Sequence, residues 1–320
     1  MTFTDSFKNG FEVLNKNWAV VAIQIAAIFV AMMGFVILIA IPLVLAAVVF
    51  GSDLMQIVNN FSLESLTSLI TAKHLSIAIV IALVLTVYIL AMVLILVFIY
   101  GGSCGVLAKS VQERKYGFTL KGFYVEGKRM FFPLLGFNIV IGFITAIEFA
   151  VLAVCYFLML SLRDTVNAGN GQLANFIEIF SALITLTVLF FLLTGTLSVN
   201  VYGTSILTLR GGGVFRALRG SVSFIINKPS AYWFYLVCIA GFIGINIALL
   251  IIGAIISVIP FIGAVLAIPF QLLLQVAQSY MGFLVISSVF SYYHGVTGGE
   301  SISPSDILAE ALQPGGPPPD

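Results

Sequence analysis

The chain has 320 residues, of which 61% are hydrophobic and only 8% charged, and its formal net charge is +1. A soluble domain carries about 25% charged residues, because its surface has to be solvated. The composition therefore excludes an ordinary soluble protein, and the small net charge excludes bulk attraction to nucleic acid. We expect an all-α integral membrane protein.

Six apolar runs are long enough to cross a bilayer, which requires roughly 20 apolar residues in a helix. They are, in chain order, about Trp18–Ile41, Ser76–Tyr100, Phe131–Leu160, Phe176–Tyr202, Tyr232–Val258 and Ala264–Tyr292. The first run continues past Pro42 to Phe50, and as one helix it would measure about 50 Å against a hydrocarbon core of about 30 Å. We therefore expect this helix to tilt strongly or to break near Pro42.

Lysine and arginine are unevenly distributed between these runs. Of the 14 such residues, 12 precede the first run, separate the second from the third, or separate the fourth from the fifth. Loops rich in these residues stay in the cytoplasm. The pattern predicts six spans with both termini cytoplasmic and one sizeable external loop, residues 51–75.

The three basic stretches are also amphipathic. Apolar residues recur at helical spacing in each, and the predicted stripes are Phe7, Phe11, Leu14 and Trp18; Leu120, Phe123, Tyr124 and Phe131; and Val214, Leu218, Val222 and Ile225. Such segments lie flat on an anionic leaflet. The residues predicted to contact lipid headgroups are Lys8, Lys16, Lys121, Lys128, Arg129, Arg216, Arg219 and Lys228. The alternative is that these cations only fix the topology.

The sequence also repeats a pattern of one basic segment followed by two spans. Tyr100-Gly101, Tyr202-Gly203 and Tyr280-Met281-Gly282 close the even-numbered spans. We predict three pseudo-repeats, residues 1–115, 116–212 and 213–296, arranged as parallel repeats about an axis along the membrane normal. Convergence of common juxtamembrane patterns is the alternative. Together the repeats form one transmembrane domain, 1–296.

The last segment, residues 297–320, differs in character. It contains four acidic residues and no basic ones, and it ends in a Pro/Gly-rich stretch. We expect a cytoplasmic tail that is either disordered or a docking peptide for a protein partner.

Glu148 is the acidic residue nearest the middle of a span. A charge at that depth costs at least about 2.5–3.5 kcal/mol, so an intramembrane acid suggests a functional site. Glu148 is interpreted either as a proton or cation relay or as a neutral group that bonds neighbouring helices. The other candidate intramembrane polar residues are Gln271, Gln275 and Gln278, spaced along one face of the sixth run, together with Asn200 and Asn246. They form either interhelical hydrogen bonds or a polar pathway.

No motif indicates catalysis. The three cysteines form no C-x-x-C pair and have no neighbouring histidine, so neither a metal site nor a cofactor is expected. The sequence predicts a protein that is not an enzyme.

Three segments carry a resemblance to a bacterial group of six-span membrane proteins. They are Phe7-Lys8-Asn9-Gly10-Phe11 through Asn15-Lys16-Asn17-Trp18, Gly102 through Gly105, and Phe215-Arg216-Ala217-Leu218-Arg219-Gly220-Ser221. The layout resembles the membrane domain attached to some glycerophosphodiester phosphodiesterases and its uncharacterised relatives. The soluble phosphodiesterase domain and its metal ligands are missing from this sequence. The resemblance therefore implies a membrane module that works with lipid or with a separate partner.

The hypothesis from the sequence is a multi-pass protein of the bacterial cytoplasmic (inner) membrane. We expect a non-catalytic scaffold or accessory subunit that associates with a partner or with anionic lipid. The alternative is a transporter or channel for a small solute or lipid, using Glu148 and the glutamines of the sixth span.

Overall fold

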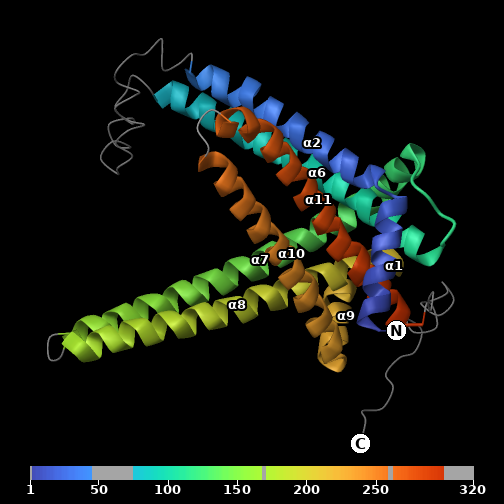
Figure 1. Ribbon diagram of the computed structural model, residues 1–320. Helices are drawn as coiled ribbons and strands as arrows, with labels where there is room; N and C mark the ends of the chain where they lie inside the picture. The colour runs from blue at the N-terminus through green and yellow to red at the C-terminus, as the bar shows by residue number, and fades with distance from the viewer. Residues whose placement is uncertain (1, 45–74, 168–170, 259–261, 299–320) are drawn as a thin grey trace, which may run out of the picture. The chain divides into compact units, whose positions relative to one another are not determined.

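The computed structural model describes residues 2–44, 75–167, 171–258 and 262–298 (Figure 1). Every regular element within these ranges is a helix, and none is a strand. The elements are α1 (Phe3–Lys16), α2 (Ala19–Phe35), the π-helix η1 (Val36–Ala40), α6 (Leu75–Gln112), α7 (Leu120–Asn167), α8 (Gly171–Leu209), α9 (Val214–Asn227), α10 (Pro229–Val258) and α11 (Ile262–Val296). Residues 45–74 and 299–320, which hold the predicted external loop and nearly all of the acidic tail, lie outside the described residues.

Six stretches of these helices are long and apolar enough to span a membrane. They are Ala19–Val44, Ile81–Gln112, Leu120–Ser161, Asn175–Leu209, Pro229–Ile256 and Pro269–Val296. The predicted fold class, an all-α protein with six membrane-spanning helices, is confirmed. The physical reason is that a helix satisfies its own backbone hydrogen bonds, so length and apolarity are enough to define a span.

The chain forms two compact units, and the smaller one comprises Ala19–Tyr100. Within it α2 pairs with the first part of α6: the Tyr88 hydroxyl donates a hydrogen bond to the Ala31 carbonyl, and the Tyr88 ring lies 6.2 Å from that of Phe35. The first span stays helical through Pro42 to Val44. Its irregularity is η1, just before the proline, and local π adjustments of this kind let a membrane helix accommodate proline.

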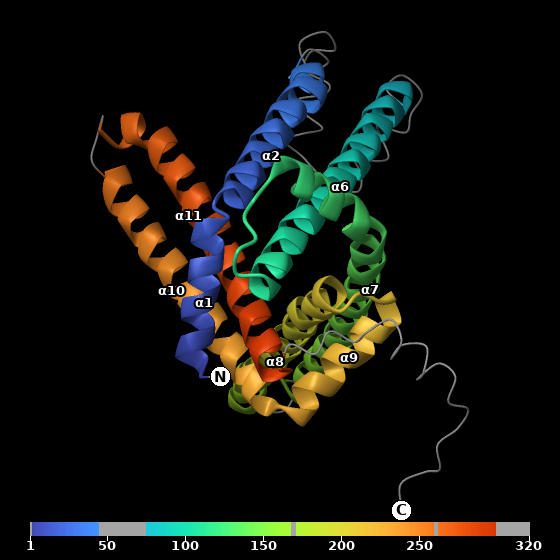
Figure 2. The ribbon, with the colours of Figure 1, turned by 90° about the vertical axis from the view of Figure 1, so that its right-hand side faces the viewer.

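The larger unit comprises Met1–Trp18 and Gly101–Asp320. Its helices α7 and α8 lie side by side as a long hairpin (Figure 1), and α10 and α11 pack together as a second pair. Helix α1 packs against α11, and α9 packs against α8 (Figure 2). Both short helices end before the following span begins, as expected for separate amphipathic segments.

The second basic segment differs from the other two. It is not a separate short helix, because α7 runs without interruption for 48 residues from Leu120 to Asn167 and includes Pro133. The helical segment therefore runs into the third span without a break in the helix. It does so although it contains Gly122 and Gly127 and is followed by Pro133, residues that often end or kink a helix.

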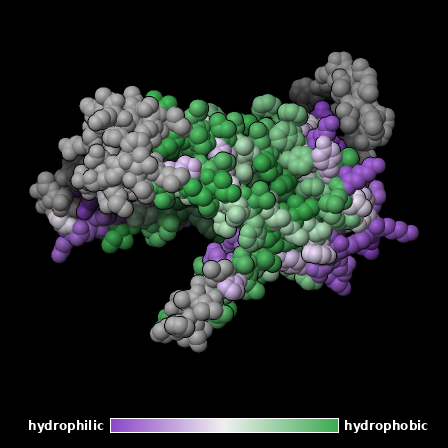
Figure 3. Space-filling model, turned by 90° about the horizontal axis from the view of Figure 1, so that it is seen from above, coloured by the Kyte–Doolittle hydropathy of each residue, from purple (hydrophilic) through white to green (hydrophobic). Residues whose placement is uncertain are grey.

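The buried side chains of the larger unit gather near the basic segments. In α7 they lie between Phe123 and Ile141, in α8 between Thr194 and Thr208, and in α11 between Leu274 and Tyr293. Beyond those ranges, the described parts of the spans expose large apolar residues. Hydrophobic residues dominate the surface seen in Figure 3, and hydrophilic residues lie toward the edges of the view. Exposed apolar helix surface in a membrane protein faces lipid, so the packed core occupies one end of this unit.

Small residues make the contact between α1 and α11. Ser6, Gly10 and Leu14 form the buried face of α1. A Cβ on Gly10 would lie only 2.5 Å from the Ser288 Cα, and the Ser287 hydroxyl donates a hydrogen bond of 2.9 Å to the Gly10 carbonyl. The two backbones can approach this closely only because position 10 has no side chain.

Helix α9 also packs through small residues, since its buried residues are Ala217 and Ser221, four positions apart.

The residues of the predicted apolar stripe of α1 differ in their burial. Leu14 packs inside the protein, whereas Phe7 and Phe11 are 46% and 44% exposed. The contacts of α1 and α9 with the rest of the unit therefore include small residues, together with Leu14 and ring contacts such as that of Phe3 with Phe234. Other large apolar residues, such as Phe7 of α1 and Phe215 of α9, stay largely exposed.

Candidate functional site

Glu148 of α7 meets one polar group from the neighbouring helix. The Thr196 hydroxyl of α8 donates a hydrogen bond of 2.5 Å to Glu148 Oε1. The other carboxyl oxygen, Oε2, is buried and has no hydrogen-bond partner among the described residues. Leaving a buried oxygen without a hydrogen-bond partner costs free energy. The second oxygen of Glu148 is therefore available to accept a hydrogen bond from a ligand or to carry a proton.

Glu148 lines a groove of about 600 Å³ formed by residues of α7, α8 and α9 together with Tyr232 of α10. Most of the lining is aliphatic or aromatic, including Leu218 and Val222 from the short helix α9. The Tyr232 hydroxyl lies 2.8 Å from that of Thr194. The groove can hold an apolar chain and offers it one hydrogen-bonding carboxyl group.

The other predicted polar residues are placed elsewhere. On α11, Gln271 is exposed and Gln275 and Gln278 are half-buried. Asn246 donates its side-chain amide to Phe242 O, 2.8 Å away in its own helix, and Asn200 keeps a buried Oδ1 with no partner within the described ranges. The residues that line the groove of Glu148 include none of these five. The structure brings together Glu148 and Thr196, and it does not assemble Glu148 and the glutamines into one site.

A second cluster was missed by the sequence reasoning. Glu126 is only 1% exposed, and its two carboxylate oxygens each lie 2.6 Å from a cation, Lys109 of α6 and Arg129 of α7. Gly105 permits this burial, since a Cβ there would lie 2.6 Å from Glu126 Cβ. The available signal was the acid at three-residue spacing from Arg129 within a basic stretch, together with the glycines of Gly101–Gly105.

The residues predicted to contact headgroups have different environments. Arg129 is engaged with Glu126, and the Lys16 amine donates a hydrogen bond of 2.6 Å to the Arg114 carbonyl. The remaining six are exposed on the surface of the larger unit, namely Lys8, Lys121, Lys128, Arg216, Arg219 and Lys228. Within the part of the chain that the structure describes, no group of three or more His, Cys, Asp or Glu residues could hold a metal ion.

These elements define an α-helical multi-pass membrane protein. No protein-family model matches the chain, and comparisons with curated proteins and with solved structures also gave no match. The resemblance to the membrane domain of glycerophosphodiester phosphodiesterases stays a prediction.

Proposed function

We propose that the protein is a non-enzymatic scaffold of a bacterial cytoplasmic membrane that binds anionic lipid through its short basic helices, with both termini cytoplasmic. The observation that carries the proposal is the construction of α9. This helix is held to the protein by Ala217 and Ser221, while Phe215 and Ile226 are 76% and 70% exposed.

Cations lie beside these exposed apolar residues. Arg216, Arg219 and Lys228 are all exposed on α9 or at its end. An amphipathic helix with apolar and cationic groups outside its protein contact suits the boundary between headgroups and acyl chains. Each cation near an anionic leaflet contributes about 1 kcal/mol, so the three together contribute about 3 kcal/mol at low salt.

Lipid binding in nanodiscs tests this assignment. In nanodiscs that contain the protein, the triple variant R216Q/R219Q/K228Q should bind anionic phosphatidylserine from the surrounding lipid roughly 100-fold more weakly than the unaltered protein does, at low salt. Raising the ionic strength should weaken the unaltered protein in the same direction, because the attraction is screened. Arg163→Gln, near the opposite end of α7, is the control. Equal affinity of the triple variant and the unaltered protein would refute the role of α9.

The proposed orientation has its own test. In a variant whose native cysteines are replaced, single cysteines at positions 115 and 310 should react with an impermeant thiol reagent only after cells are permeabilised. A cysteine at position 65 should react in intact cells. External labelling at position 115 would overturn the assigned orientation.

A second candidate function, passage of a small solute or lipid, is favoured by one observation: the unpartnered oxygen of Glu148 in its groove. If Glu148 is a relay, Glu148→Gln should abolish a proton or solute flux in liposomes while leaving thermal stability unchanged. If it only joins helices, the same change should be nearly silent, and Glu148→Leu should lower the unfolding temperature. Wild-type flux in the Gln variant would remove the relay.

A further inference from the structure

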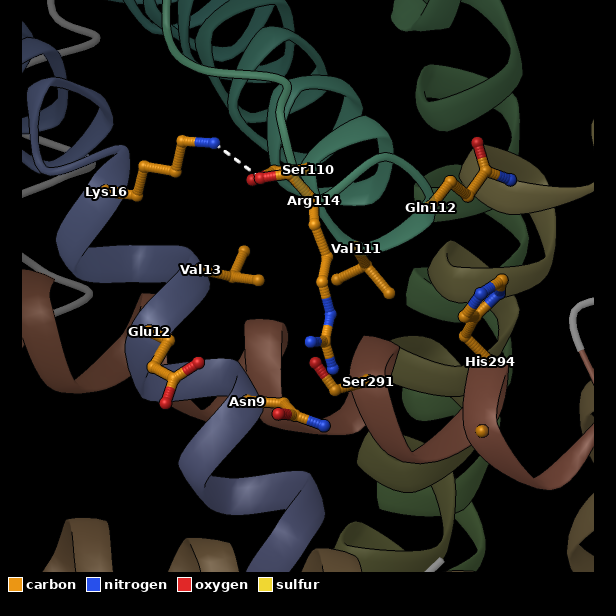
Figure 4. A pocket seen from close by; sticks show the side chains of 11 residues that line it. Asn9, Glu12, Val13, Lys16, Ser110, Val111, Gln112, Arg114, Ser291 and His294 are labelled. Carbon is orange, nitrogen blue, oxygen red and sulfur yellow. Dashed lines mark hydrogen bonds between the residues drawn. The ribbon is translucent and has the colours of Figure 1, made fainter.

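A polar pocket of about 410 Å³ lies in the larger unit, apart from the outward surface of α9. Its walls come from α1, from the end of α6 with the turn that follows, and from α11 (Figure 4). Its polar lining includes Asn9, Glu12, Lys16, Gln112, Arg114, Ser291 and His294. Its volume is within the range of small-molecule sites.

Several bonds fix the walls of this pocket. The Asn17 amide donates to Ser110 Oγ at 2.9 Å and so joins the end of α1 to α6. Lys16 donates to the Arg114 carbonyl, and Gln112 donates to the Leu209 carbonyl at 3.0 Å. The close contact at Gly10 fixes α1 to α11. The pocket is therefore bounded by elements that are bonded to one another.

Two polar groups in this pocket have unused bonding capacity. Ser291 is 3% exposed, and its hydroxyl has no hydrogen-bond partner among the described residues. The Arg114 side chain extends across the pocket toward Ser291 and Asn9 in Figure 4. Its guanidinium makes no ion pair with any residue that the structure describes. A buried hydroxyl and a guanidinium facing one space provide several donors for one acceptor group.

The charged residues that line the pocket favour an anionic group as the hydrogen-bond acceptor. Arg114 and Lys16 are cationic, and His294 adds a further nitrogen, against the single carboxylate of Glu12. The planar guanidinium fork matches the oxygens of phosphate. Glu12 lies across the pocket from His294 in Figure 4, where it provides an acceptor for a hydroxyl or amino group.

We propose that this pocket binds a phosphate group through Arg114 and Ser291, with Lys16 and His294 beside it. The phosphate belongs either to a phosphorylated small molecule from the aqueous phase or to the headgroup of a lipid. This site is separate from the proposed contact of α9 with the leaflet, which uses outward-facing residues.

The test is the unfolding temperature of the purified full-length protein in detergent, with potassium phosphate titrated against potassium chloride at equal ionic strength. Phosphate that binds the folded protein raises the unfolding temperature in a concentration-dependent manner. The apparent affinity should fall at least about tenfold in Arg114→Gln, as expected from loss of a charged hydrogen bond, and by a smaller factor in Ser291→Ala. Arg163→Gln, an arginine of α7 outside the pocket and outside the proposed lipid contacts of α9, is the control and should leave the response unchanged.

A second arm distinguishes the two sources of phosphate. The same variants are compared in phosphatidylcholine nanodiscs with and without phosphatidic acid. Stabilisation by phosphatidic acid that depends on Arg114, and that free phosphate does not reproduce, assigns the site to a lipid headgroup. Stabilisation by free phosphate with no added effect of phosphatidic acid assigns it to a soluble ligand. If neither stabilises the protein, or if Arg114→Gln and Arg163→Gln respond alike, the proposal is wrong.

The acidic tail provides the last control, because its residues follow closely after the pocket-lining Gly295. The full-length variant E300Q/D306N/E310Q/D320N removes its four acidic side chains. A phosphate response seen in this variant and absent from the unaltered protein would mean that the tail carboxylates occupy the pocket. That outcome would overturn the assignment of an external phosphate ligand.

Discussion

In the ion-pair cluster of Glu126, Lys109 and Arg129, we expect loss of the cations to destabilise the protein more than loss of the carboxylate. The carboxylate is 1% exposed, whereas the side chains of Lys109 and Arg129 are 35% and 50% exposed. Removing both cations leaves a buried charge without compensation. Removing the carboxylate leaves two cations that can turn toward water. The double variant K109M/R129M should therefore lose more stability than Glu126→Gln.

The structure sets the expected magnitudes. Leaving a buried carboxylate without its cations costs about 3–5 kcal/mol, so K109M/R129M should fall in that range. Glu126→Gln removes two ion pairs, but the partial exposure of both cations reduces the loss to about 1–2 kcal/mol. The buried amide of the Gln variant keeps some of the hydrogen bonding at the same position.

Equilibrium unfolding in mixed micelles, with increasing sodium dodecyl sulfate, measures the difference. The free energies of unfolding of the two variants are compared with that of the unaltered protein. The triple variant K109M/E126Q/R129M should recover part of the loss of the double variant, because its buried charge is gone. If Glu126→Gln is more damaging than K109M/R129M, burial of the carboxylate does not control the energetics and the reasoning fails.

Three further predictions concern the short helix α1 and the smaller unit. Gly10→Ala should cost about 1–3 kcal/mol of unfolding free energy, because the new Cβ meets the Ser288 backbone at 2.5 Å; Gly142→Ala, with no atom within 4 Å of its Cβ, should cost little in the same thermal unfolding assay. Tyr88→Phe should lose about 1 kcal/mol, because the bond to the Ala31 carbonyl disappears, and an unchanged unfolding temperature would contradict that contact. The hydrogen bond from the Thr2 hydroxyl lowers the pKa of Asp5 below 3.8, so the cap of α1 should be fully stabilising above that pH and lost as the pH falls through the lowered pKa. Hydrogen exchange at the start of α1 measures this loss, and an equal response of the Asp5→Asn variant would exclude the carboxyl as its cause.

The spans could be predicted because their signal is local. A stretch such as Ala19–Val44 is recognised from its own length and apolarity, since its backbone bonds close within the helix. Local signals do not settle where the second basic segment ends. Amphipathic character does not say whether a helix stops, and α7 continues through Pro133 into the third span.

The candidate sites could be predicted only in part. Glu148 was identifiable from its depth in an apolar run, but its partner Thr196 is 48 residues away in the sequence. For Glu126 the sequence shows the spacing from Arg129 but not the burial, because the burial depends on the absence of a side chain at Gly105 in another helix. The exposure of a side chain depends on which residues pack against it, and a single sequence does not show which distant residues these are.

The sequence alone therefore determined that the chain belongs in a membrane, how many helices are long enough to cross it, and which short helices carry cations. Tertiary structure decided which helix each short helix contacts. The Tyr280 hydroxyl of α11 donates a hydrogen bond of 2.6 Å to Asn15 Oδ1 of α1, across 265 residues of sequence. The packing of α1 on α11 requires small residues such as Gly10 and Ser288 to face each other where the two helices meet. The hydropathy of the sequence does not show which helix surfaces fit together in this way.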